Sequence, residues 1–83
     1  MYEAILSNRA EKRLSRLPAG EYERVLQAVM SLAEGPHPRN HRKLQGREGW
    51  RIRVGDYRVI YEIDDTTREV LVVTLVHRKD IYR

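Results

Sequence analysis

The sequence predicts a small α+β fold in which an N-terminal strand and a hairpin of two helices pack on a small antiparallel sheet. Three observations predict it. Apolar residues recur every three or four positions between residues 8 and 34, as on the buried side of a helix. Apolar and polar residues alternate over 50–63, as in strands with one buried face. A nearly unbroken apolar run over 70–76 is typical of an interior strand. A chain of 83 residues is expected to form one domain, spanning residues 1–83.

The first half of the chain supplies the first strand and both helices. Residues 2–6 alternate and predict the strand, and Ser7 has a hydroxyl suited to cap a helix. Segment 17–20 contains proline and glycine and should break that helix. A second helix is then expected from about Glu21 until Gly35-Pro36 stops it. The apolar residues of the two helices are Ala10, Leu14, Leu17, Tyr22, Val25, Leu26, Val29, Leu32 and Ala33.

The second half supplies the sheet. Residues 36–49 lack periodicity and predict a basic loop with a short extended piece at Lys43-Leu44. A strand follows at 50–54, and Gly55-Asp56 is a two-residue hairpin signal with glycine first. The chain returns over 57–63, with its odd-numbered residues on the apolar face.

The last strand is predicted at residues 70–76, after a turn at 64–68. Its only polar member is a threonine, so we expect both of its faces to be covered and the strand to be central. If the strand persists, Arg78 shares the face of its even-numbered residues. Residues 77–83 then leave the sheet as a short basic tail.

The two-residue turn fixes a register that gathers arginines. Arg53 faces Arg58 and Arg51 faces Ile60, so three guanidiniums share one face, with Glu62 the acidic residue nearest to them. Like charges at facing positions are destabilising. Arginines at this spacing offer bidentate donors to phosphate oxygens and suit an anionic ligand. The alternative is a set of exposed arginines neutralised by solvent anions.

The distribution of charge supports an anion-binding surface. The net charge is +4, and residues 39–58 hold seven basic residues against two acidic ones, so the remainder of the chain carries −1. The basic loop residues Lys43 and Arg47 are candidates for substrate binding. Near the C-terminus, Tyr82 follows Arg78 by four positions and could stack on a nucleobase or donate its hydroxyl proton. Packing of Tyr82 on the sheet edge is an equal alternative.

Other chemistry finds little support in the sequence. The absence of cysteine excludes disulfides and thiolate metal sites, and with no apolar run near the length of a membrane span it favours a cytoplasmic protein. His37, His41 and His77 are too scattered to predict a metal site. No serine lies in a nucleophile elbow, and Gly46 and Gly49 form no phosphate-loop motif.

The segment Trp50–Ile63 resembles the RelE/ParE superfamily of toxins from bacterial type II toxin–antitoxin systems. The resemblance extends to Leu14-xx-Leu17-Pro18, to Lys43-Leu44-xx-Gly46 and to His77-Arg78-xx-Ile81-Tyr82. It implies two helices against an antiparallel sheet. In the RelE branch the toxin enters the ribosomal A site and cuts messenger RNA without a metal or other cofactor. The ribose 2′-hydroxyl attacks the adjacent phosphorus and leaves a cyclic phosphate and a free 5′-hydroxyl.

The family's catalytic positions match Arg51, Arg53, Arg58, Arg78 and Tyr82. The resemblance implies that the first three grip the scissile phosphate, that Arg78 supports the leaving oxygen, and that Tyr82 stacks on a base or transfers a proton. The best-known RelE members have lysine at the positions of Arg51 and Arg53. Arginine stays protonated and cannot readily act as a base, so the identity of the general base stays open.

Two other functions remain possible on the sequence alone. The ParE branch inhibits DNA gyrase by binding, although its members generally lack the full set of five residues. An RNA-binding protein without turnover is the third alternative. In either toxin branch the resemblance implies a partner antitoxin whose helices wrap the domain and cover its basic face.

Overall fold

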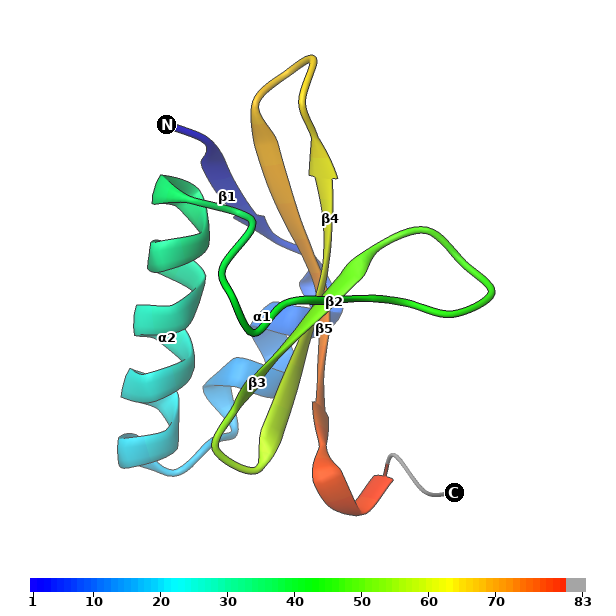
Figure 1. The fold of residues 1–83 in the computed structure, drawn as a ribbon. Coiled ribbons are helices and arrows are strands. Elements are labelled where there is room, and N and C mark those ends of the chain that lie inside the picture. Colours follow the sequence, from blue (N-terminus) through cyan, green and yellow to red (C-terminus); the bar gives the residue numbers. More distant parts are fainter. Residues whose placement is uncertain (81–83) are drawn as a thin grey trace.

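A computed structural model describes residues 1–80 of the chain as two helices and a five-stranded sheet (Figure 1). The strand order is β1-β5-β4-β3-β2. The elements are β1 (Glu3–Leu6), α1 (Asn8–Ser15), α2 (Ala19–Glu34), β2 (Arg42–Lys43), β3 (Trp50–Val54), β4 (Tyr57–Asp64), β5 (Glu69–His77) and the 3-10 helix η1 (Arg78–Asp80). The predicted α+β fold is confirmed. β1 pairs with β5 in parallel and the other pairs are antiparallel, so the sheet is mixed.

The helices begin at identifiable caps. The Ser7 hydroxyl accepts a hydrogen bond from the Ala10 backbone N–H at 3.0 Å, as predicted, and donates one to the Val73 carbonyl at 2.6 Å. The cap therefore also ties α1 to β5. α2 begins at Ala19, earlier than predicted, because Pro18 occupies the N-cap position, where a missing N–H removes no helical hydrogen bond.

The hairpin of β3 and β4 has the predicted register, with Val54 opposite Tyr57 and Arg53 opposite Arg58. Gly55 begins the turn at a φ of 60°, in the left-handed region that favours glycine. A Cβ atom there would also lie 3.2 Å from the Arg24 guanidinium of α2. The conformation of the turn therefore favours glycine, whereas the long Arg24 side chain could move aside for a Cβ atom.

A bulge in β5 changes which side chains share a face. Ile60 pairs with Thr74 but Tyr61 pairs with Val72, so Val73 is skipped. After the bulge in sequence, Val76 lies opposite Arg58, on the sheet face directed away from the helices. Before the bulge, Val72 is buried against the helices. The prediction that the even-numbered residues of this strand share one face is therefore wrong.

The expected double covering of the last strand is also wrong. β5 is an interior strand between β1 and β4, while β4 occupies the centre of the order. Leu71 is 37% exposed, because α2 and the core lie on the opposite face (Figure 1). The continuous apolar run reflects the bulge, which exchanges the faces partway along the strand.

No helix within residues 1–80 is long and apolar enough to cross a membrane.

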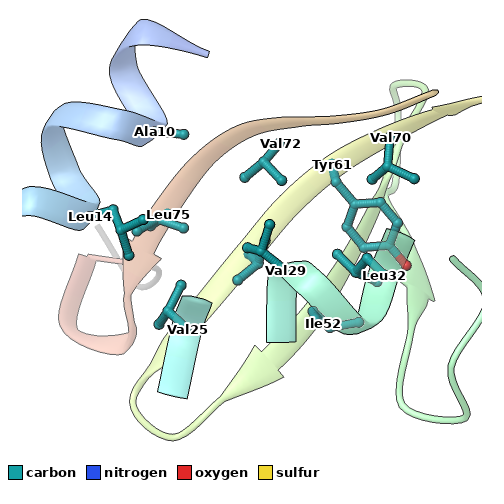
Figure 2. Close-up of a cluster of buried hydrophobic side chains, with 11 residues drawn as sticks. Ala10, Leu14, Val25, Val29, Leu32, Ile52, Tyr61, Val70, Val72 and Leu75 are labelled. Carbon is teal, nitrogen blue, oxygen red and sulfur yellow. The ribbon is translucent and has the colours of Figure 1, made fainter. Parts of the chain in front are cut away.

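The core lies between the helices and the sheet (Figure 2). Tyr61 is wholly buried, and its hydroxyl donates a hydrogen bond to the Pro36 carbonyl at 2.9 Å. Burial raises the pKa of Tyr61 to about 12. The same loop is held by His41, whose ring stacks on Trp50 at 4.3 Å between centroids. These contacts fix the position of the loop that precedes β2. The strand β2 itself begins one residue earlier than predicted.

Replacing Tyr61 with phenylalanine should lower the free energy of unfolding by about 1–2 kcal/mol, because the buried Pro36 carbonyl would lose its donor. Urea denaturation monitored by circular dichroism measures the change. Tyr22→Phe is the matched control, since the Tyr22 hydroxyl has no hydrogen-bond partner within residues 1–80. Equal stability of Tyr61→Phe and the wild type would show that this hydrogen bond does not stabilise the fold.

Candidate functional site

A pocket of about 320 Å³ lies beside the β3–β4 turn, where the chain leaves β5. We call it the arginine pocket. It is lined by Arg53, Gly55, Asp56, Tyr57, Arg58, Arg78 and Lys79. Three of the five catalytic candidates predicted from the sequence therefore meet at one depression.

The facing pair Arg53 and Arg58 supplies the pocket with charge from β3 and β4. Arg53 is exposed, and its Nε donates a hydrogen bond to the Gly55 carbonyl at 3.2 Å, which turns the guanidinium toward the hairpin. Arg58 is half-buried, and its side chain makes no hydrogen bond or ion pair within residues 1–80. Because the register holds two like charges together, an anion bound between them would remove an unfavourable interaction.

Arg78 reaches the pocket from the segment after β5. Its backbone N–H donates a hydrogen bond to the Asp56 carbonyl at 2.7 Å, and its Nε lies 3.8 Å from an Asp56 carboxylate oxygen. The bulge in β5 contributes to this placement, because it puts Val76 on the face of Arg58 just before the strand ends. The main-chain bond fixes the position of Arg78, since the exposed ion pair is long and weak.

Arg51 lies on the same sheet face as Arg53 but does not line the pocket. It faces Ile60 on one side and Arg42 of β2 on the other. The Arg42 guanidinium donates hydrogen bonds to the carbonyls of Arg39 and His41 at 3.2 and 2.9 Å, which holds it toward its own loop. Sequence reasoning missed Arg42 because the extended piece was placed one residue too late.

The remaining candidates are not brought into the arginine pocket. Lys43 lies with its Nζ 5.1 Å from the centre of the Trp50 ring, a cation–π contact, and lines a separate hollow with acidic neighbours. Arg47 belongs to the exposed loop between β2 and β3 and lines neither depression. Tyr82 lies outside the described residues.

Two charged residues of the pocket were not recognised from the sequence as functional. Lys79 follows Arg78 in the basic tail, a signal that was available. Asp56 was recognised only as a turn residue, and its contact with Arg78 depends on the fold. Among residues 1–80, no three histidine or acidic side chains are grouped so that they could hold a metal ion. His37 and His41 do come together, at 5.2 Å between ring centroids, but they pack with Trp50.

The arrangement suits an exposed phosphodiester. Guanidiniums converge from two strands and from the segment after β5, and they can bind phosphate oxygens and stabilise charge that develops on them. The pocket is open, so a chain of nucleotides could pass across it. Tyr57, whose ring meets His77 edge-on at 5.0 Å, supplies one wall.

Comparison with known proteins gives consistent matches. Residues 4–82 match the family described as ParE toxin of type II toxin-antitoxin system, parDE. Toxin RelG of Mycobacterium tuberculosis (strain ATCC 25618 / H37Rv) is 33% identical over 90 residues, covering 99% of this chain and 97% of RelG.

Solved structures share the fold. The archaeal RelE–RelB complex from Pyrococcus horikoshii OT3 contains a chain that is 29% identical, with a TM-score of 0.80 over 93% of this chain and 94% of that one. The isolated E. coli RelE toxin, at 23% identity, has a TM-score of 0.80 over 99% of this chain and 92% of its own.

Sulfate should stabilise the wild type against heat more than chloride does at equal ionic strength. Arg58→Gln should abolish this difference, because one of the two guanidiniums that bind the anion is lost. Without sulfate, the variant should be as stable as the wild type within about 0.5 kcal/mol, or more stable, since a repulsion is relieved. Differential scanning calorimetry measures both quantities. Arg9→Gln, on the exposed side of α1, is the control and should keep the full sulfate effect. A sulfate effect that survives in Arg58→Gln would contradict anion binding at this pair.

Proposed function

The chain belongs to the RelE/ParE superfamily of toxins from type II toxin–antitoxin systems, and we propose that it is an endoribonuclease of the RelE kind that cuts messenger RNA on the ribosome. One observation carries this proposal. Arg53, Arg58 and Arg78 converge on a single open pocket although they come from three separate elements. A surface that served only solubility would not require facing arginines, which are destabilising in the free protein.

The pocket suggests a division of roles along the RNA backbone. Arg53 and Arg58 grip the scissile phosphate, and Arg78 supports the oxygen that leaves. Arg51 lies two positions from Arg53 on the same strand face and contributes from outside the pocket, where it can meet the same or the adjacent phosphate. Lys43 and Arg47 contact RNA farther along its backbone. Tyr82 stacks on a base or takes part in proton transfer, as the family resemblance implies.

The proposed partners follow from the same family. The matched Pyrococcus horikoshii chain comes from a complex of RelE with RelB, which supports a cognate antitoxin for this chain as well. An antitoxin that covered the arginine pocket would exclude RNA directly. We place the protein in the cytoplasm, because that is where ribosomes and messenger RNA are found.

A second function is gyrase inhibition without cleavage, and one observation favours it. The matching family model is described by the ParE toxin. RelG and the RelE relative from Pyrococcus horikoshii favour the ribonuclease, and so does the pocket, because it concentrates three guanidiniums where they can stabilise the charge of a reacting phosphate.

Purified protein should cut messenger RNA on programmed ribosomes in the presence of EDTA, since the proposed chemistry uses only the chain's own side chains. Primer extension detects the cut. A parallel supercoiling assay with DNA gyrase distinguishes the two functions. Intact messenger RNA together with inhibited supercoiling would contradict the ribonuclease and favour the ParE function.

Tyr82 tests whether the C-terminal residues belong to the site, since a residue so near a chain end is ordinarily dispensable. Tyr82→Ala should lose both stacking and the hydroxyl and cut slowest, by about tenfold or more for the loss of 1–3 kcal/mol of stacking. Tyr82→Phe keeps the ring and should be slowed only if the hydroxyl transfers a proton. Single-turnover cleavage on saturating ribosomes measures the chemical step separately from binding. Wild-type cleavage by Tyr82→Ala would leave the arginines as the whole site.

A further inference from the structure

Attack by a 2′-hydroxyl requires a group that removes its proton, and guanidiniums cannot readily do so. Lysine and tyrosine side chains in general hold their protons at neutral pH and are poor bases as well. Among the residues that line the arginine pocket, only Asp56 carries a carboxylate. The geometry points to Asp56 as the general base that accepts the proton of the attacking 2′-hydroxyl, which presupposes the ribonuclease function proposed above.

The Asp56 carboxylate is available to a substrate. Its side chain is 57% exposed, and it accepts no hydrogen bond within residues 1–80. The nearest charged group within residues 1–80, Arg78 Nε, lies 3.8 Å away, which is beyond hydrogen-bond length. Within residues 1–80 the lone pairs of the carboxylate therefore accept no hydrogen bond, and the long ion pair with Arg78 is the contact recorded for them.

Other carboxylates around the sheet have structural partners instead. Asp64 accepts hydrogen bonds from the backbone N–H groups of Thr66 and Thr67 at 2.9 and 3.1 Å. Asp65 accepts one from the Tyr2 hydroxyl at 2.5 Å. These groups stabilise the β4–β5 turn and the N-terminus, at the end of the sheet away from the arginine pocket. Among the described residues, none donates such a hydrogen bond to the Asp56 carboxylate, although Asp56 too occupies a turn.

The backbone holds Asp56 in a fixed relation to the arginines. It is the second residue of the turn that sets Arg53 opposite Arg58, and its carbonyl accepts the 2.7 Å hydrogen bond from Arg78. Asp56 therefore lines the same pocket as the arginines, and a phosphate bound there would bring its ribose close to the carboxylate. Proximity of this kind is the geometric requirement for a general base.

The step balances with groups that the pocket contains. Asp56 takes the 2′-hydroxyl proton as the 2′-oxygen bonds to phosphorus, and the bond from phosphorus to the 5′-oxygen breaks. Lys79, as an ammonium, gives a proton to the leaving 5′-oxygen. The products are a 2′,3′-cyclic phosphate and a 5′-hydroxyl. Asp56 then releases its proton to solvent, and Lys79 takes one from solvent.

Asp56→Asn tests the assignment, because it keeps the size of the side chain and the backbone hydrogen bond to Arg78 but cannot accept a proton. The single-turnover rate on saturating ribosomes should fall by about 100-fold or more, the usual contribution of a general base. Ribosome binding, measured separately by co-sedimentation, should be unchanged. Asp56→Glu should recover part of the rate. Glu62→Gln, an exposed carboxylate of β4 that does not line the arginine pocket, is the control and should cut as the wild type does.

A double-mutant cycle separates proton transfer from the positioning of Arg78. In an Arg78→Gln background, Asp56→Asn should still lower the rate at least about tenfold, since the base acts on the substrate and not through Arg78. No further loss in that background would overturn the assignment and leave Asp56 as a positioning residue. Cleavage by Asp56→Asn at the wild-type rate would overturn it as well. Failure of the wild type itself to cut would instead overturn the proposed function, and the inference with it.

Discussion

The two-residue turn at Gly55 and Asp56 determines where the charged groups of the pocket lie. Only a left-handed residue such as Gly55, at a φ of 60°, lets β3 reverse within two residues, and the pairing that follows sets Arg53 directly opposite Arg58. A shift of one residue in this register would carry one of the arginines toward the buried face. The carbonyl of Asp56 then anchors Arg78, so the same turn also organises the segment after β5.

The rest of the fold stabilises an arrangement that would not be stable alone. Facing guanidiniums repel, and an isolated two-stranded hairpin is at best marginally stable. Here β4 is held between β3 and β5, and its buried Tyr61 connects the sheet to the loop at Pro36. The core on the opposite face offsets the repulsion between Arg53 and Arg58, which remain placed to bind an anionic ligand. The proposed site and the core thereby lie on opposite faces of one sheet.

Sequence patterns predicted the features that depend on neighbouring residues. The cap at Ser7, the alternation in β3 and the register of the hairpin all follow from local chemistry. The bulge at Val73 could not be predicted, because an all-apolar run has no period that reveals where the faces exchange. The contact of Asp56 with Arg78 joins distant parts of the sequence and depends on that bulge. Arg51 also satisfied the alternating pattern, but it lies two positions farther from the turn than Arg53 and does not line the pocket.

The chemistry of the cut ends tests the central claim, that the arginine pocket promotes attack by a ribose hydroxyl on its own phosphate. Messenger RNA fragments from a ribosome-bound reaction can be labelled by polynucleotide kinase with and without prior phosphatase treatment, and their 3′ ends can be identified by mass spectrometry. We expect 5′-hydroxyl ends that label without phosphatase, together with 2′,3′-cyclic phosphates. Fragments with 5′-phosphate and 3′-hydroxyl ends would show that water or another nucleophile attacked, and would contradict it.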